Sequence, residues 1–390
     1  MPSSSYDLAI IGGGVLGAFH AYHALQAGLR VALFEKNSRP QGATVRNFGQ
    51  VVPSGLNAEW QPLGCESLHI YQSLHQEVDL TMWAGGSMYL ASDEEEQQLL
   101  HELAERNRQA GYTSELWSAE QCCAHYPGLR QEYVREGLFF PAEISLDPRQ
   151  MVHRLLAFMT EKYGLHYFPG HAVAGLSETS YGVKIDTLCG SRHDAGQVVV
   201  CNGSEFALLF PGLFRASDIQ VVKLHMLETE PQPRQRIPGN ILTGLTIRRY
   251  ESFQECPSWA AVKAGENPYS FGREYGVHIL FKQADDGAVI IGDSHEYAPV
   301  ADADNLGFDL DNRINRYMME KAMAIFELEN WTIRRAWYGI YSQRAEAAIY
   351  RHSPQERIHI VTAIGGKGMT VSPAFAKKSL QDLGVVASPV

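Results

Sequence analysis

The sequence predicts an α/β protein in which a Rossmann-like unit is interleaved with a second unit built on an antiparallel sheet. Three observations support this fold class. Residues 6–35 follow the order strand, glycine turn, helix and strand, residues 165–293 are rich in short strand patterns, and a glycine-rich turn at 365–368 precedes the last predicted helix. Because the β-rich stretch separates the other two features, we expect two interleaved domains rather than two consecutive ones.

The first predicted unit begins with an apolar strand at 8–11 and ends with a second apolar strand at 31–34. Between them, Gly12, Gly14 and Gly17 have the spacing of a dinucleotide-binding fingerprint. Gly12 permits the tight turn, Gly14 lets the backbone approach a pyrophosphate, and Gly17 lets the helix pack closely on the strand. This spacing between two strands therefore predicts a nucleotide site.

The helix start and the end of the second strand complete this predicted site. Val15 and Leu16 open the helix, whose free N–H groups and positive dipole favour phosphate groups. Glu35 ends the strand, where it is placed to accept hydrogen bonds from an adenosine ribose, and Lys36 follows it. A carboxylate at this position repels a 2′-phosphate, which disfavours NADP.

Apolar periodicity and turn residues predict the remaining elements. Helices are expected at 57–78, 92–110, 148–162, 311–326 and 373–383, and a capping box at 118–121 begins a further short helix. Strands are expected at 83–90, 137–141, 165–168, 171–176, 181–187, 197–201, 219–229, 241–249, 276–282, 287–293, 332–341 and 357–362. Gly287, after two aspartates, marks a hairpin.

Composition and charge exclude several classes of protein. The chain has 390 residues, enough for two domains, and its formal net charge of −11 without a basic stripe argues against nucleic-acid binding. No apolar run approaches the roughly 20 residues that a membrane span requires, and residues 1–5 leave no room for a signal peptide. The six cysteines form no C-x-x-C pair and no zinc-ligand cluster. We therefore expect a cytoplasmic protein with free thiols and no metal site.

Four segments together resemble a known group of flavoproteins. They are the glycine fingerprint with Glu35, the loop Ala-Thr-Val-Arg-Asn-Phe-Gly-Gln at 43–50, the strand end at 198–203, and the turn Gly-Gly-Lys-Gly-Met-Thr at 365–370. Over nearly its whole length, the chain is similar to the FAD-dependent D-amino-acid oxidase/glycine oxidase/sarcosine oxidase superfamily. The resemblance implies FAD as cofactor, bound non-covalently, because no cysteine stands where some sarcosine-type members attach the flavin.

The resemblance also implies a division of the chain and a set of cofactor contacts. The Rossmann-like (GR2-type) FAD-binding domain is expected over 1–80, 143–220 and 334–390, and the substrate-binding domain over 81–142 and 221–333. By analogy, the loop at 43–50 passes along the isoalloxazine ring, and the C-terminal turn presents N–H groups to the flavin pyrimidine. The positions so implied are Thr44, Arg46, Asn47, Gly49, Gln50, Val173, Gly203, Gly366, Lys367, Gly368, Met369 and Thr370.

One departure from the family pattern bears on the substrate. Members that oxidise glycine or D-amino acids usually have a Gly-Leu-Arg stretch whose arginine binds the substrate carboxylate. Here Tyr341 stands at the position of that arginine, and Arg344 comes three residues later. A tyrosine hydroxyl cannot replace a bidentate guanidinium, so this departure argues against a plain α-amino acid.

The chain also resembles a subgroup of these flavoproteins associated with phosphonate catabolism, through segments 46–50, 276–280 and 291–297. The resemblance implies an N-alkylated aminophosphonate as substrate. A phosphonate dianion favours more than one cation, and Arg248 and Arg249 would alternate on a strand, so at most one of them points inward. The predicted substrate-binding residues are Arg344, Arg248, Arg249 and His225, and the residues predicted to orient the amine are Tyr338, Tyr341 and His278.

The expected reaction is hydride transfer from the carbon beside the amine nitrogen to flavin N5, followed by hydrolysis of the imine to an aldehyde. One alternative is a D-amino-acid or 2-hydroxy-acid dehydrogenase that uses Arg344 to bind a carboxylate. The other is a flavin-binding protein without turnover. The sequence leaves open the exact amine, the electron acceptor and the oligomeric state.

Overall fold

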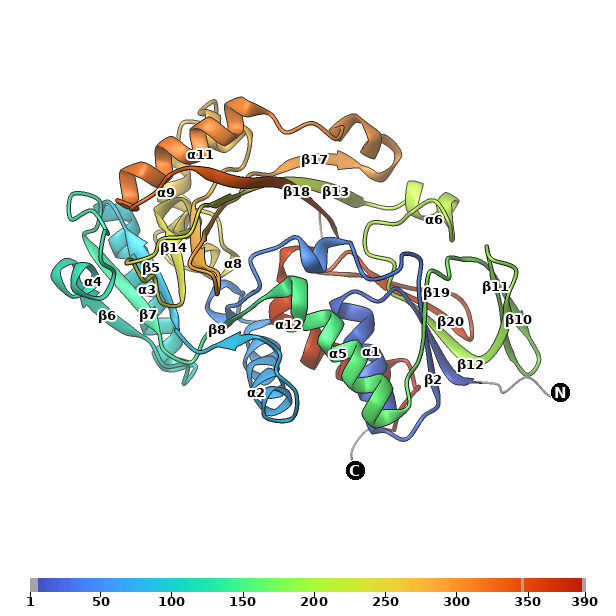
Figure 1. Cartoon of the computed structure of the whole chain (residues 1–390). Coiled ribbons are helices and arrows are strands. Elements are labelled where there is room, and N and C mark those ends of the chain that lie inside the picture. The colour runs from blue at the N-terminus through green and yellow to red at the C-terminus, as the bar shows by residue number, and fades with distance from the viewer. Residues whose placement is uncertain (1–5, 345–346, 388–390) are drawn as a thin grey trace.

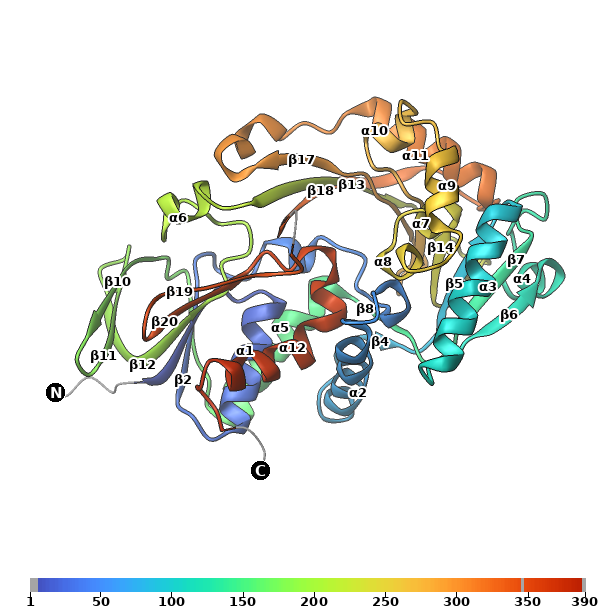
Figure 2. The same ribbon diagram turned by 180° about the vertical axis from the view of Figure 1, so that it is seen from behind.

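The computed structural model of the chain describes residues 6–344 and 347–387. Residues 1–5, on which the expectation of no signal peptide rests, lie outside the described residues. In Figure 1 the glycine-turn unit and its helices occupy one end of the molecule, and a larger sheet arches over these helices toward the other end. Figure 2 shows the same arrangement from behind, with segments from both halves of the chain in each sheet.

The smaller of the two large sheets contains the predicted βαβ unit. Strands β1 (Tyr6–Ile11) and β2 (Val31–Glu35) are parallel, with Leu8 opposite Val31, and α1 (Val15–Gln26) connects them. The strand order is β10-β11-β12-β1-β2-β9, with β20 beside β12 and β19 beside β20. The further strands are β9 (His166–Pro169), β10 (Val173–Thr179), β11 (Gly182–Thr187), β12 (Arg192–Val200), β19 (Tyr350–Gln355) and β20 (Ile358–Thr362).

Helices cover one face of this sheet and bury its apolar side chains. Helix α1 packs against α12 (Gly368–Asp382) and α5 (Pro148–Tyr163), and α12 packs against α2 (Gln61–Glu77). Leu8, Leu33 and Phe19 are among the fully buried residues of the core between sheet and helices. Both ends of the chain therefore belong to the same unit, as expected for an interleaved fold.

The larger sheet has the strand order β17-β13-β16-β15-β14-β5-β7-β6, and β18 pairs with β13. All of these pairs are antiparallel except β14 with β5. The strands are β5 (Ser87–Ala91), β6 (Glu115–Ser118), β7 (Glu136–Phe140), β13 (Ile219–Thr229), β14 (Asn240–Thr243), β15 (Leu280–Gln283), β16 (Val289–Gly292), β17 (Glu296–Pro299) and β18 (Ile333–Arg344). The predicted α/β class with a second, largely antiparallel sheet is confirmed.

A small third sheet and further helices and turns complete the fold. A three-stranded sheet has the order β3-β8-β4, from β3 (Gln50–Val51), β8 (Ile144–Leu146) and β4 (Met82–Trp83). The other helices are α3 (Glu94–Gln109), α4 (Ala119–His125), α6 (Pro211–Arg215), α7 (Gly244–Ile247), α8 (Glu251–Gln254), α9 (Trp259–Gly265), α10 (Phe271–Glu274) and α11 (Asn312–Ile325). Short 3₁₀ turns are η1 (Ala43–Val45), η2 (Pro53–Gly55), η3 (Val300–Leu306) and η4 (Gly365–Lys367).

Several predicted elements have different bounds in the structure. The strand expected at 241–249 ends at Thr243, where the chain turns into α7. Gly244 begins this helix, and a Cβ there would lie 2.1 Å from the Glu96 carboxylate. The strand expected at 276–282 begins only at Leu280. The last helix starts at 368 rather than 373, so Pro373 lies inside it. Because proline has no N–H, the Met369 carbonyl lacks its usual helical partner. The Tyr71 hydroxyl donates to this carbonyl instead.

The predicted domain boundary at residue 334 divides β18, which pairs along β13 in the larger sheet from Ile333 to Arg344. We therefore propose to place this boundary after Arg344. No helix in the described part of the chain is long and apolar enough to cross a membrane.

Candidate active site

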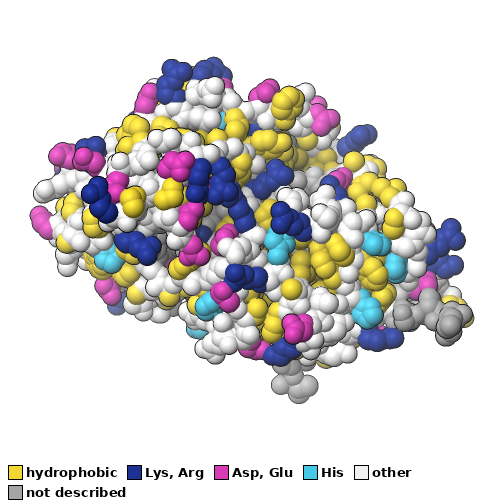
Figure 3. Space-filling model, in the orientation of Figure 1, with side chains coloured by type: hydrophobic (Ala, Val, Ile, Leu, Met, Phe, Trp, Pro, Cys, Tyr) yellow, Lys and Arg dark blue, Asp and Glu magenta, His cyan; other side chains and the backbone are white. Residues whose placement is uncertain are grey.

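A cavity of about 1550 Å³ lies between the glycine-turn sheet and the larger sheet. Its volume exceeds the ~300–1,000 Å³ of a typical small-molecule pocket, so it has room for a dinucleotide and a second ligand. All predicted cofactor positions except Gly17 line it. On the face in Figure 3, several basic side chains gather near the middle, and acidic side chains lie beside them.

The glycine turn forms one wall of the cavity. Gly12 has φ +110°, and a Cβ there would lie 2.3 Å from the Cys201 carbonyl oxygen. A Cβ on Gly17 would lie 2.0 Å from the Gly12 carbonyl oxygen, so Gly17 acts from behind the turn by letting α1 pack against it. Gly14, Val15 and Leu16 line the cavity, and α1 has no side-chain cap. This helix start suits a diphosphate.

The predicted ribose end of the site is formed by β2 and the segments beside it. Glu35 is buried, and its carboxylate accepts hydrogen bonds from the backbone N–H groups of Gly13 and Asn37. Lys36 lines the cavity and forms an ion pair with Glu205. Val173 and Gly203 also line it.

The loop at 43–50 has a fold of its own that depends on Asn47. Its side-chain amide donates to the Ala43 and Thr44 carbonyls at 3.0 Å each, while its Oδ1 accepts from Gly49 N–H at 2.6 Å. The Thr44 hydroxyl accepts from Val15 N–H at 2.9 Å, which joins the loop to the start of α1. The remaining predicted loop residues, Arg46 and Gln50, line the same cavity.

A buried lysine that the sequence analysis did not single out also holds this loop. Lys282, on β15, donates to the carbonyls of Phe48, at 2.8 Å, and Leu146. Burial lowers its pKa from the ordinary value of 10.5 to about 7. Lys282 therefore joins the larger sheet to the loop predicted to lie along the flavin.

The C-terminal turn forms the opposite wall. Gly366, Gly368, Met369 and Thr370 line the cavity at the start of α12, which has no side-chain cap. Lys367 forms an ion pair with Glu251 of α8 at 2.7 Å. Its charge is therefore balanced by a carboxylate and is not unpaired toward the cavity.

The structure separates the predicted substrate cations. Arg248 and Arg249 follow α7 rather than alternating on a strand, which corrects the expected geometry. Arg248 does not line the cavity, since it forms ion pairs with carboxylates of Asp93, Glu95 and Glu96. Arg249 does line it.

Two further predicted substrate residues have partners within the protein. His225 is fully buried outside the cavity, with Nδ1 3.0 Å from the Asn315 side-chain oxygen and Nε2 3.5 Å from Glu296. Arg344 lines the cavity but forms an ion pair with Asp218 at 2.8 Å. His225 is therefore unsuited to substrate binding, and the charge of Arg344 is already compensated.

Arg249 lies among tyrosines at the end of the cavity away from the glycine turn. Its Nη2 donates to the Tyr297 hydroxyl at 2.6 Å. Burial opposes its charge, but Tyr297, Tyr341 and Asp293 together raise its pKa. Burial raises the pKa of Tyr341, so this hydroxyl remains protonated and can donate. Tyr338, also predicted, lines the cavity from the same strand, β18.

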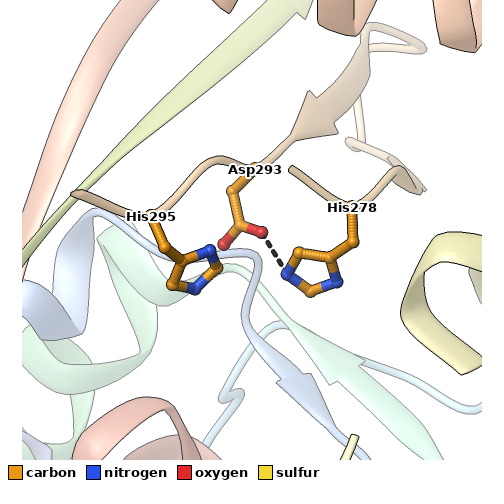
Figure 4. Close-up of side chains that lie close together, drawn as sticks. All are labelled: His278, Asp293 and His295. Carbon is orange, nitrogen blue, oxygen red and sulfur yellow. Dashed lines mark ion pairs between the residues drawn. The ribbon is translucent and has the colours of Figure 1, made fainter. Parts of the chain in front are cut away.

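Next to Arg249 lies a cluster of His278, Asp293 and His295 (Figure 4), of which only His278 was predicted. His278 Nε2 lies 2.5 Å from Asp293 Oδ1. Burial alone would raise the pKa of Asp293, but His278, His295 and Arg249 outweigh it and hold this pKa below its ordinary value. Burial lowers the pKa of His295 to about 3, so this ring is neutral. Asp293 and His295 fall in segment 291–297, which carries part of the subgroup resemblance, but neither residue is among the predicted site residues.

Comparisons with known proteins agree with this site. A family model described as FAD dependent oxidoreductase matches residues 7–379. The chain is 26% identical over 216 residues to a glycine oxidase of Geobacillus kaustophilus, an alignment that covers 52% of this chain and 56% of that protein. It thus spans about half the length of that relative. It is 23% identical over 362 residues to an opine oxidase component of Agrobacterium tumefaciens, covering 89% and 85% of the two chains.

Solved structures show the same fold. The crystal structure of glycine oxidase from Geobacillus kaustophilus superimposes with a TM-score of 0.78 at 17% identity, over 98% of this chain and 96% of that one. The turn that only glycine allows, the start of α12 without a side-chain cap and the cavity volume all fit FAD. This chain belongs to the family of FAD-dependent oxidoreductases, and FAD is its cofactor.

Proposed function

We propose that this protein oxidises the C–N bond of a small amine that carries an acidic group. One observation supports the acidic group above all others: Arg249 lies in the cavity with Tyr297 as a hydrogen-bond partner, while Arg248 and Arg344 are paired with carboxylates. A guanidinium that lines a partly enclosed cavity favours an anionic ligand, which it can bind through two N–H groups.

Arg249 also accounts for the departure at Tyr341. Both residues line the cavity, and each contributes to the pKa shift of the other. The guanidinium thus comes from the segment after α7 instead of from β18, and the Tyr341 hydroxyl is available as a further donor. An acid group can then be bound although the arginine is missing from its usual position.

The chemistry that FAD supplies when bound is acceptance of a hydride from the carbon beside the amine nitrogen, which leaves an imine for hydrolysis. The protein supplies orientation and charge, with Arg249 holding the acid group and Tyr338 and Tyr341 bordering the amine. The absence of cysteine other than Cys201 from the described cavity lining supports non-covalent FAD. The free state of all six cysteines supports a cytoplasmic location.

For the acid group, we propose a phosphonate, in an N-alkylated 2-aminoethylphosphonate that is oxidised to an aldehyde. The support is the resemblance of segments 46–50, 276–280 and 291–297. The second candidate is an amine with a carboxylate, since a glycine oxidase and an opine oxidase component are among the relatives and one guanidinium matches one carboxylate. A protein without turnover is disfavoured by the intact cofactor and substrate ends of the cavity.

Anaerobic reduction of the bound flavin tests both candidates. Purified holoenzyme is mixed with 2-(methylamino)ethylphosphonate, N-methylglycine, D-alanine, lactate and simple alkylamines, and loss of the flavin absorbance is followed. We expect rapid bleaching by an amine with an acid group and none by alkylamines. Faster bleaching by the phosphonate than by N-methylglycine supports the phosphonate, and the reverse order supports the carboxylate. Bleaching by lactate alone would refute amine oxidation.

A further inference from the structure

Two hydrogen-bond acceptors lie beside the Arg249 guanidinium at the end of the cavity. Asp293 Oδ1 lies 2.5 Å from His278 Nε2 in an ion pair, and no hydrogen bond to Asp293 Oδ2 is found among the residues that the structure describes. His295 Nδ1 lies 3.0 Å from the Gly276 carbonyl oxygen, which can only accept. Nδ1 therefore carries the hydrogen, and Nε2 of the neutral ring keeps its lone pair.

These acceptors and the guanidinium come together at Gly276. A Cβ on this glycine would lie 3.0 Å from Arg249 Nη1 and 3.0 Å from the His295 Cβ. Asp293 and His295 both line the cavity. In the described part of the chain, neither side chain forms an ion pair or a hydrogen bond with Arg249. The end of the cavity thus has one pole that donates hydrogen bonds and one that accepts them.

We propose that Asp293 and His295 bind the nitrogen of the substrate through two N–H hydrogens, while Arg249 binds its acid group. This inference rests on the proposed function and names the class of amine. A primary or secondary ammonium offers at least two N–H hydrogens, a tertiary ammonium offers one, and a quaternary ammonium offers none. The bound ammonium then releases one proton to solvent, and the neutral amine so formed gives up the hydride. The site therefore selects primary and secondary amines and discriminates against hydroxy acids, whose hydroxyl has a single hydrogen.

His278 acts in this arrangement as a positioning residue. Its Nε2 lies 2.5 Å from Asp293 and its Nδ1 lies 3.2 Å from the Thr246 hydroxyl, so both ring nitrogens have partners within the protein. This fixes one carboxylate oxygen and leaves the other for the ligand. We therefore assign His278 the role of holding Asp293 rather than that of binding the amine itself.

A metal ion is the alternative occupant of this cluster. One ligand atom from each of His278, Asp293 and His295 can be chosen so that all three lie within 4.8 Å of one another. Two features oppose a divalent ion: His278 Nε2 already lies against Asp293, and the nearby guanidinium of Arg249 repels a double positive charge more strongly than the single charge of an ammonium. Two histidines and a carboxylate are nevertheless a common set for divalent transition metals, so the test includes metal analysis.

The test uses a series of ligands in which each step replaces one N–H hydrogen by a methyl group. N-methylglycine, N,N-dimethylglycine and glycine betaine offer two, one and none as cations, and the N-methylated 2-aminoethylphosphonates form the same series. Dissociation constants come from the anaerobic flavin absorbance, by reduction or by spectral shift. In the wild-type holoenzyme we expect affinity to fall at each methylation. In Asp293→Asn we expect the dissociation constant of N-methylglycine to rise at least tenfold and that of glycine betaine to rise at most twofold. The FAD content of this variant is expected to stay unchanged.

A matched variant and two further measurements complete the test. Asp186→Asn removes a half-exposed carboxylate of β11 that pairs with Arg192 and lies outside the cavity. This variant is expected to bind the series as the wild type does. If Asp293→Asn does not fold, His295→Gln is tested for the same selective loss. Unchanged affinity for N-methylglycine in both variants would overturn the inference, as would one equivalent of bound metal that disappears in Asp293→Asn. The proposed function fails separately, if no amine reduces the wild-type flavin although the series binds.

Discussion

The cofactor end and the substrate end of the cavity are built in different ways. At the cofactor end the walls are the glycine turn, the start of α1 and the turn before α12, so backbone N–H groups and the lack of side chains define the site. At the substrate end the walls are the side chains of Arg249, Asp293, His295 and Tyr341, which come from separate segments of the larger sheet and its connections. Backbone geometry suits a constant ligand, and side chains suit a variable one.

The largest expected effect is at the cofactor end. Gly17→Ala adds a methyl group that would lie 2.0 Å from the Gly12 carbonyl oxygen. The glycine turn or α1 must therefore move. We expect an at least ~tenfold loss of bound FAD, because overpacking of this kind costs about 1–3 kcal/mol. The ratio of flavin absorbance to protein concentration after gel filtration measures the amount of bound FAD. Gly212→Ala, where a Cβ meets nothing within 4 Å, is the control. Full FAD content in Gly17→Ala would break the comparison.

The second prediction concerns the substrate end. Arg249→Met removes the guanidinium that we propose binds the acid group. We expect kcat/KM for the acid-bearing amine to fall roughly 30- to 1,000-fold, as loss of a buried charge partner costs about 2–4 kcal/mol. Arg248→Lys, at the neighbouring arginine whose partners are carboxylates, serves as the comparison. Its activity per FAD-loaded molecule is expected to match the wild type. Equal losses in the two variants would contradict the assignment.

A third prediction concerns Lys282, which joins the two ends. The folded protein releases this proton near pH 7, whereas an unfolded chain keeps it to about pH 10.5. Because the unfolded state binds more protons in this window, the residue makes the free energy of unfolding rise with pH, by at most about 1.4 kcal/mol per pH unit.

Lys282→Met removes this pH dependence. Urea unfolding of both proteins at pH 7, 8 and 9 measures it, and the stability of the wild type relative to Lys282→Met is expected to increase with pH. A difference that stays constant across this range would show that Lys282 has no depressed pKa.

The smallest effect is expected at the Lys367–Glu251 pair, which links the flavin-side turn to α8. Since each charge balances the other, Lys367→Gln and Glu251→Gln are expected to change kcat/KM by less than about threefold, as for a partly exposed ion pair. The reduction potential of the bound flavin is the sharper measurement. If the Lys367 charge acts on the flavin, its removal in Lys367→Gln lowers the reduction potential, and Glu251→Gln does not. If the pair only links the turn to α8, both variants show similar small shifts of the reduction potential.

The cofactor end could be predicted from sequence because its determinants are local. Gly12, Gly14 and Gly17 lie within one turn and one helix start, and β13 at 219–229 has the predicted bounds because its pattern is uninterrupted. The capping box at Ser118 is present as expected. Local backbone requirements of this kind can be recognised in a single sequence.

The substrate end could be predicted only in part. Arg248 and Arg249 are adjacent and chemically identical, yet the ion pairs of Arg248 depend on carboxylates of α3 and its N-cap that are distant in sequence. Asp293 and His295 follow a strand without any spacing typical of a site, and their proximity to His278 comes from the pairing of β15 with β16. Contacts between remote segments decide these roles.

A crystal structure of the FAD-loaded protein with a bound acid tests the central claim most directly, and methylphosphonate and acetate are suitable ligands. The account predicts that the acid oxygens lie within hydrogen-bond distance of the Arg249 guanidinium and the Tyr297 hydroxyl. The account would be contradicted by an acid bound to Arg344 with the Arg344–Asp218 ion pair broken. It would also be contradicted by an acid bound away from both Arg249 and Arg344.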